Sequence, residues 1–182
     1  MSATATQKQT LDESFIGYLE SLLKRDDRAI LAHLRRGLGK EPGTAMEMFP
    51  YIARFVQNSY RSDENAYFLV ASVFGLYPTY SWKSDEKGKN NLGKSMSFLK
   101  DDSESIEKRF VALLNADEED LPNHLRQIVS LLKAKDKPID WLQLLKDIKG
   151  WSSESKYVQR NWAKGFWGNT NTENTEKGEE KQ

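Results

Sequence analysis

The chain has 182 residues, with 27 lysines and arginines balanced by 27 aspartates and glutamates, and no cysteine. The length suffices for one domain or two small ones with a self-sufficient core, and the lack of cysteine excludes disulfides, thiolate metal sites and cysteine nucleophiles. The polar N-terminus and the absence of an apolar run of roughly 18 to 20 residues argue against a secreted or membrane protein, so we expect a cytoplasmic one.

The first predicted elements are two amphipathic helices. Residues 1–10 have almost no large apolar side chain and are expected to be disordered. Apolar residues recur at helical spacing over 11–24. They recur again from Asp26 or Asp27, a favourable N-cap, to Gly39, a favourable residue for ending a helix.

The middle of the chain predicts a buried helix and a polar loop. Pro50 suits the first turn of a short helix that runs to Val56. The segment 65–77 is apolar nearly all round, which predicts a central helix that ends before Pro78. A polar loop with several lysines follows, and a helix resumes at about Lys94.

The C-terminal part repeats the helical pattern, and we find no convincing strand-like alternation. Asp140 and Gln143 form a possible capping box. Four tryptophans are expected in the core rather than on bases: Trp141, Trp151, Trp162 and Trp167. The tail 168–182 is expected to be disordered. Helices are predicted around Ile106–Leu113, Leu121–Leu132, Trp141–Ile148 and Ser155–Trp167.

These elements predict an all-α protein without a sheet. We expect a helical bundle-like architecture.

One motif points to a nucleoside triphosphatase, and its context argues against that function. Residues 88–95 read GKNNLGKS, which matches the phosphate-loop pattern. That motif needs a buried apolar strand before it and a second strand that supplies an acidic magnesium ligand. The preceding SWKSDEK is polar, and no apolar run ending in Asp follows. We therefore interpret the segment as a loop with Lys94 available to a phosphate.

Other enzyme signatures are weak. His33 and His124 are isolated, which predicts packing or surface roles rather than metal binding. No serine has the context of an activated nucleophile. Asp117 to Asp120 are interpreted as capping the helix that begins at Leu121, although four acidic residues could hold a cation. We predict a protein that is not an enzyme and needs no metal or cofactor.

Charge is segregated along the chain. Residues 101–120 carry eight acidic and two basic side chains, whereas residues 121–167 carry nine basic and four acidic ones. Several predicted helices offer a basic edge, such as Arg126 and Lys133, which are seven residues apart. If these edges align, they form a surface that follows a phosphodiester backbone without reading bases.

The stretch from Glu107 to Trp151, followed by VQRNWAKGFW, resembles the CRISPR-associated Cascade small subunit, or CasB, of type I-E systems. The similar segments are RF-x-x-LL-x-AD, HLR-x-I-x-x-L and PIDW, with RAILAHLRRGLG, AYFLVASVFGLYP and NLGKSMSFL before them. Their order and spacing over about residues 11–167 carry the resemblance.

The resemblance implies two small helical subdomains, an N-terminal one over 11–93 that includes the basic loop and a C-terminal one over 94–167. It implies a non-catalytic antiviral subunit that contacts guide RNA and target DNA, including the displaced strand. It also implies contacts with the large subunit, the backbone subunits and a second copy of itself. The alternative is a helical protein–protein scaffold without direct nucleic-acid contact. The predicted nucleic-acid-binding residues, from the basic pattern and the resemblance together, are Arg28, Arg35, Arg36, Lys87, Lys89, Lys94, Arg109, Arg126 and Lys133.

Overall fold

A computed structural model describes residues 10–83 and 90–168. Within these residues the chain is all-α, as predicted, and no strand is present. The α-helices are α1 (Leu11–Lys24), α2 (Arg28–Leu34), α3 (Phe49–Val56), α4 (Arg61–Leu76), α5 (Leu92–Ser97), α6 (Glu104–Asn115), α7 (Leu121–Ala134), α8 (Trp141–Lys149) and α9 (Tyr157–Trp167). Two 3₁₀ turns, η1 (Arg35–Gly37) and η2 (Met46–Met48), precede α3.

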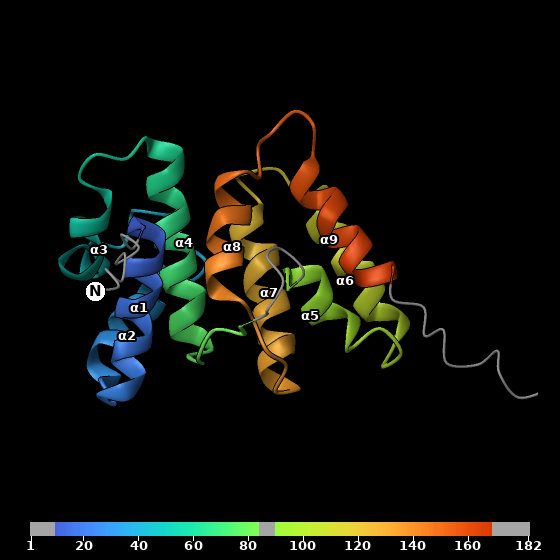
Figure 1. Cartoon of the computed structure of the whole chain (residues 1–182), viewed down its shortest axis with the longest axis horizontal. Helices are drawn as coiled ribbons and strands as arrows, with labels where there is room; N and C mark the ends of the chain where they lie inside the picture. The colour runs from blue at the N-terminus through green and yellow to red at the C-terminus, as the bar shows by residue number, and fades with distance from the viewer. Residues whose placement is uncertain (1–9, 84–89, 169–182) are drawn as a thin grey trace, which may run out of the picture.

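The helices form an elongated array. Figure 1 shows α1 to α4 at one end, α5, α6 and α9 at the other, and α7 and α8 between them. The predicted division into subdomains at residues 93 and 94 stays a prediction. The predicted disordered ends lie outside the described residues, except for Thr10, which caps α1, and Gly168, which follows α9.

Local sequence explains where several helices begin. Thr10 and Glu13 form a capping box at α1, and the Asp27 side chain caps α2 as predicted. Asp140 accepts a hydrogen bond from the Gln143 backbone N–H, but the Gln143 side chain donates to Asp147 instead of completing a capping box. The helix expected at Lys94 begins two residues earlier because Asn91 caps it.

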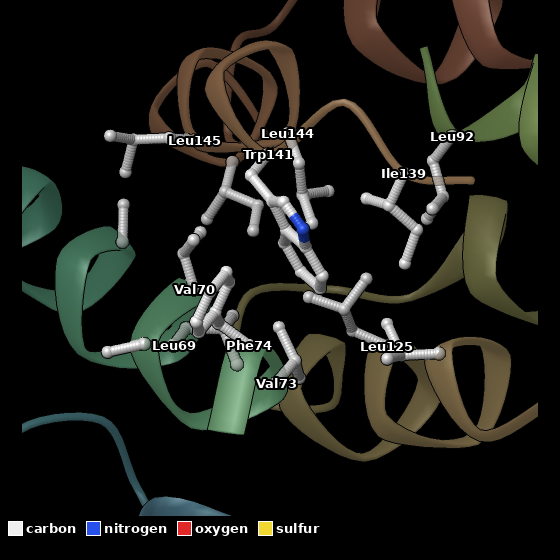
Figure 2. Packing of buried hydrophobic residues seen from close by; sticks show 14 of the residues in the cluster. Leu69, Val70, Val73, Phe74, Leu92, Leu125, Ile139, Trp141, Leu144 and Leu145 are labelled. Carbon is white, nitrogen blue, oxygen red and sulfur yellow. The ribbon is translucent and has the colours of Figure 1, made fainter. Parts of the chain in front are cut away.

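The central helix α4 is buried almost all round from Ala66 to Gly75, as the apolar segment predicts. Its Phe74 ring meets the Trp141 ring of α8 edge-on at 5.2 Å between centroids. Figure 2 shows Trp141 among Val70 and Phe74 of α4 and Leu125 of α7. Because one aromatic side chain joins three helices, α4, α7 and α8 share a core.

Helices α5 and α9 approach each other through glycine. A Cβ at Gly93 would lie 1.9 Å from the Trp162 carbonyl oxygen, so only glycine fits there. Asn91 fixes the same contact, because its side-chain amide donates to the Asn161 carbonyl at 3.1 Å. The second glycine of the phosphate-loop match therefore packs against a helix backbone.

Asp147 is a buried carboxylate in the core. It accepts hydrogen bonds from the Trp162 indole at 2.6 Å and from the Gln143 amide at 2.8 Å. Burial raises its pKa to about 6, although both hydrogen bonds favour the charged form. The folded state therefore binds this proton more tightly than the unfolded state does.

We expect Asp147→Asn to change the pH dependence of stability. A raised carboxyl pKa stabilises the fold fully below the unfolded value near 3.8, and this contribution is lost as pH rises through about 6. Asparagine keeps an acceptor for Trp162 and has no charge to desolvate. The free energy of unfolding in urea should therefore shift in favour of the variant between pH 5 and pH 7.5. Parallel pH profiles for the two proteins would contradict a raised pKa.

Candidate nucleic-acid interface

Three of the predicted cations lie around the junction of α4, η1 and α7. The Arg35 side chain packs over Gly75 of α4: a Cβ on Gly75 would lie 3.1 Å from Arg35 Cγ. The Lys133 ammonium donates a hydrogen bond, at 3.0 Å, to the carbonyl of Leu76, the residue after Gly75. Arg126 lies two helical turns before Lys133, on the same face of α7. The Arg126 side chain approaches Gly39, which lies just after η1: a Cβ on Gly39 would lie 3.1 Å from Arg126 Nη1.

The left-handed backbone of Gly39 belongs to this junction. Its φ of +73° is one that glycine adopts without strain. The missing side chain also leaves room for the Arg126 guanidinium. Gly39 therefore helps to position Arg126, and sequence analysis gave it only the role of ending a helix.

A hollow of about 460 Å³ links Arg126 to a fourth predicted cation, Arg109 of α6. Its lining contains no carboxylate. The residues are Arg109, Asn123, Arg126, Gln127, Ser130 and Leu131. Two guanidiniums and uncharged polar groups are the surroundings that suit a phosphate group.

The acidic stretch at 101–120 does not neutralise these arginines within the described residues. Asp102 pairs with Lys135 at 3.0 Å, and Glu107 accepts a hydrogen bond from the Trp167 indole. Glu118 accepts from the Ser152 hydroxyl. The described ion pairs of this stretch leave Arg109 and Arg126 unpaired. We call Arg35, Arg109, Arg126 and Lys133 the basic surface.

Among the other predicted cations, the described Arg28, Arg36 and Lys94 do not line this hollow. Arg28 pairs with Asp26 at 3.1 Å at the opposite end of α2, and both side chains are exposed. Arg36 lies near Glu47: a backbone hydrogen bond lowers the pKa of that carboxyl, and Lys40 and Arg36 lower it further. Lys94 lies on α5, which packs against α9. Lys87 and Lys89 lie outside the described residues.

Sequence analysis missed the uncharged members of the hollow. Asn123, Gln127 and Ser130 stand at helical spacing around Arg126 on α7. A sequence search for cations alone passes over such residues. The available signal was their i, i+4, i+7 spacing on the polar face of a strongly amphipathic helix.

Two of the residues weighed for metal binding or catalysis have structural partners. The His33 ring lies 2.8 Å from the Tyr51 hydroxyl, and Asp117 accepts hydrogen bonds from the backbone of Glu119 and Asp120 in the turn before α7. The predicted side-chain cap of α7 is not formed, because its N-cap residue, Asp120, makes no side-chain cap hydrogen bond. No group of three potential metal ligands occurs in the described part of the chain. Residues 10–83 and 90–168 also contain no helix with the length and apolarity of a membrane span.

The described residues thus define an all-helical protein with an arginine-lined flank. Residues 30–167 match the family model of CRISPR-associated protein Cse2. A CRISPR-associated protein Cse2 of Thermus thermophilus is 32% identical over 159 residues, which are 86% of this chain and 89% of the relative. The chain belongs to the Cse2 family, also called CasB, whose members are structural subunits of the CRISPR Cascade complex.

Solved structures share this fold. A Cse2-family protein from Thermus thermophilus has a TM-score of 0.75 at 30% identity, with 86% of this chain and 97% of that chain covered. CasB of M. ruber has a TM-score of 0.71 at 35% identity, with 88% and 94% covered. A chain of a CRISPR RNA-guided surveillance complex has a TM-score of 0.69 at 23% identity, with 86% and 91% covered, and shows the fold alone.

Proposed function

We propose that this chain is a non-catalytic, nucleic-acid-binding subunit of a CRISPR Cascade surveillance complex that acts in antiviral defence in the cytoplasm. Its basic surface stabilises the R-loop, in which guide RNA pairs with target DNA and one DNA strand is displaced. Its partners are the guide RNA, the target DNA, the large and backbone subunits and a second copy of itself.

The observation that carries this proposal is the hollow between α6 and α7. Arg109 and Arg126 line it together, and no carboxylate lines it. Arg126 also approaches Gly39. Lys133 lies two turns further along the same face of α7, beside the end of α4. Cations from separate helices therefore lie on one connected surface, as binding along a strand requires.

The energetics of R-loop formation fit a contribution of this kind. The RNA–DNA hybrid is about as stable as the DNA duplex that it replaces, so contacts between protein and backbone tip the balance. Arginines that bind phosphate oxygens without reading bases supply such contacts at any target sequence. The balanced total charge is consistent with this role, because no acidic side chain of the stretch 101–120 lines the hollow.

We expect Arg126→Glu to weaken binding of the purified protein to single-stranded DNA and to make that binding less sensitive to salt. Removing one phosphate interaction should lower the slope of log affinity against log salt by roughly 0.7. Fluorescence anisotropy with a labelled oligonucleotide at several salt concentrations measures both quantities.

Arg28→Glu is the matched control. It makes the same change of charge at an exposed arginine away from the basic surface, so it should keep the wild-type salt slope. Equal salt slopes for wild type, Arg126→Glu and Arg28→Glu would refute the proposed surface. That result would favour the helical protein–protein scaffold.

A further inference from the structure

Trp82 and Phe98 form an exposed aromatic pair beyond the end of α4, and Tyr80 stands two residues before Trp82. Tyr80 is 63% exposed and Phe98 is 46% exposed. Trp82 is half-buried, and its ring lies 5.7 Å from that of Phe98, with 47° between the ring planes. We call Tyr80, Trp82 and Phe98 the aromatic platform.

Hydrogen bonds around Ser81 hold the backbone of the segment that carries Tyr80 and Trp82. The Ser81 N–H donates to Glu20, and its hydroxyl accepts from the Trp141 backbone N–H at 2.9 Å. The Trp82 N–H donates to the Ile139 carbonyl at 2.8 Å. Tyr80 and Trp82 flank this fixed position in the chain.

One lysine lies beside the platform. The Lys137 ammonium lies 5.7 Å from the centre of the Phe98 ring. Of the carboxylates nearby, Asp102 pairs with Lys135, Asp136 accepts a hydrogen bond from the Tyr77 hydroxyl at 3.1 Å, and Glu20 accepts one from the Ser81 N–H. An aromatic surface with a cation beside it suits a ligand that has both flat rings and negative charge.

The platform is continuous with the basic surface. The segment 76–82 runs beside residues 133–139, joined first by Lys133 to Leu76 and then by Trp82 to Ile139. In Figure 1 this segment leaves the end of α4 and passes the end of α7. A strand that follows α7 from Arg126 to Lys133 would therefore reach the aromatic rings next.

We infer that the aromatic platform stacks against unpaired bases of a nucleic-acid strand whose phosphates lie on the basic surface. The inference rests on the proposed function and adds a base-binding element to it. Every base has a flat face, so stacking strengthens binding without selecting a sequence. The platform would thus favour an unpaired strand over a duplex, whose bases are already stacked.

The test compares an oligothymidine strand with an abasic strand of the same length, at one salt concentration, by fluorescence anisotropy. Wild type should bind the thymidine strand at least about fivefold more tightly than the abasic strand. Trp82→Ala and Phe98→Ala should lose that difference and keep the affinity for the abasic strand. Trp82→Phe keeps a ring and should keep most of the difference.

Tyr60→Ala is the control, because Tyr60 is 85% exposed and lies at the opposite end of α4. If wild type binds neither strand, the proposed function fails together with the inference. If salt-sensitive binding persists and the platform variants keep the wild-type preference, the inference alone is wrong. It is also wrong if these variants lose assembly with other Cascade subunits while keeping that preference, since the platform would then be a protein contact.

Discussion

Replacing Gly93 with alanine is expected to lower the free energy of unfolding by about 3 kcal/mol, the upper end of what overpacking usually costs. The added Cβ would lie 1.9 Å from the Trp162 carbonyl oxygen. The obstacle is backbone, so no side chain can turn away and α5 must move from α9. For a chain of this size the melting temperature should fall by roughly 6 to 12 °C.

Gly17→Ala is the matched control for this prediction. Gly17 is an exposed glycine in the middle of α1. There the same substitution should raise stability by up to about 1 kcal/mol, because alanine is a better helix former. A Gly93→Ala protein as stable as wild type would show that α5 and α9 do not pack as described.

Replacing Arg109 and Arg126 together with glutamate is expected to weaken target DNA binding by the assembled, guide-loaded Cascade at least about tenfold at moderate salt. Both guanidiniums line one hollow, so the double change makes a cationic site anionic. R-loop formation is nearly balanced, which makes it sensitive to the removal of interactions with the DNA backbone. A gel-shift titration with double-stranded target measures the effect.

The control is Arg28→Glu with Arg61→Glu, which makes the same total change of charge. Both are exposed arginines that pair with neighbouring carboxylates, at 3.1 Å and 3.6 Å. Exposed pairs of this kind contribute little to stability. The control complex should bind target like wild type. Equal losses in the two double variants would mean that total charge, rather than the basic surface, governs binding.

Much of the fold follows from local sequence. The predicted helix over 11–24 has the observed limits, because an apolar stripe and a capping box act within a few residues. Helix α5 begins at Leu92, two residues before its predicted start at Lys94. Its cap, Asn91, and its glycine, Gly93, serve a contact with α9, and local patterns do not report a partner so distant in sequence.

The basic surface was predictable only in part. Arg126 and Lys133 stand on one uninterrupted helix, so their spacing of seven predicts a common face. Arg28 and Arg35 have the same spacing, but they lie at opposite ends of α2, and the neighbours they meet differ: Arg28 pairs with Asp26, whereas Arg35 packs on Gly75 of α4. The approach of Arg126 to Gly39 depends on packing between distant segments.

Site-specific photocrosslinking in assembled Cascade bound to target DNA tests the central proposal most directly. A photoreactive residue at Gln127, which lines the hollow beside Arg126, should crosslink to nucleic acid. The same residue at Ala29, exposed beside Arg28, should give no such product. Crosslinks from position 127 to protein alone, or nucleic-acid products from position 29 alone, would contradict binding at the basic surface.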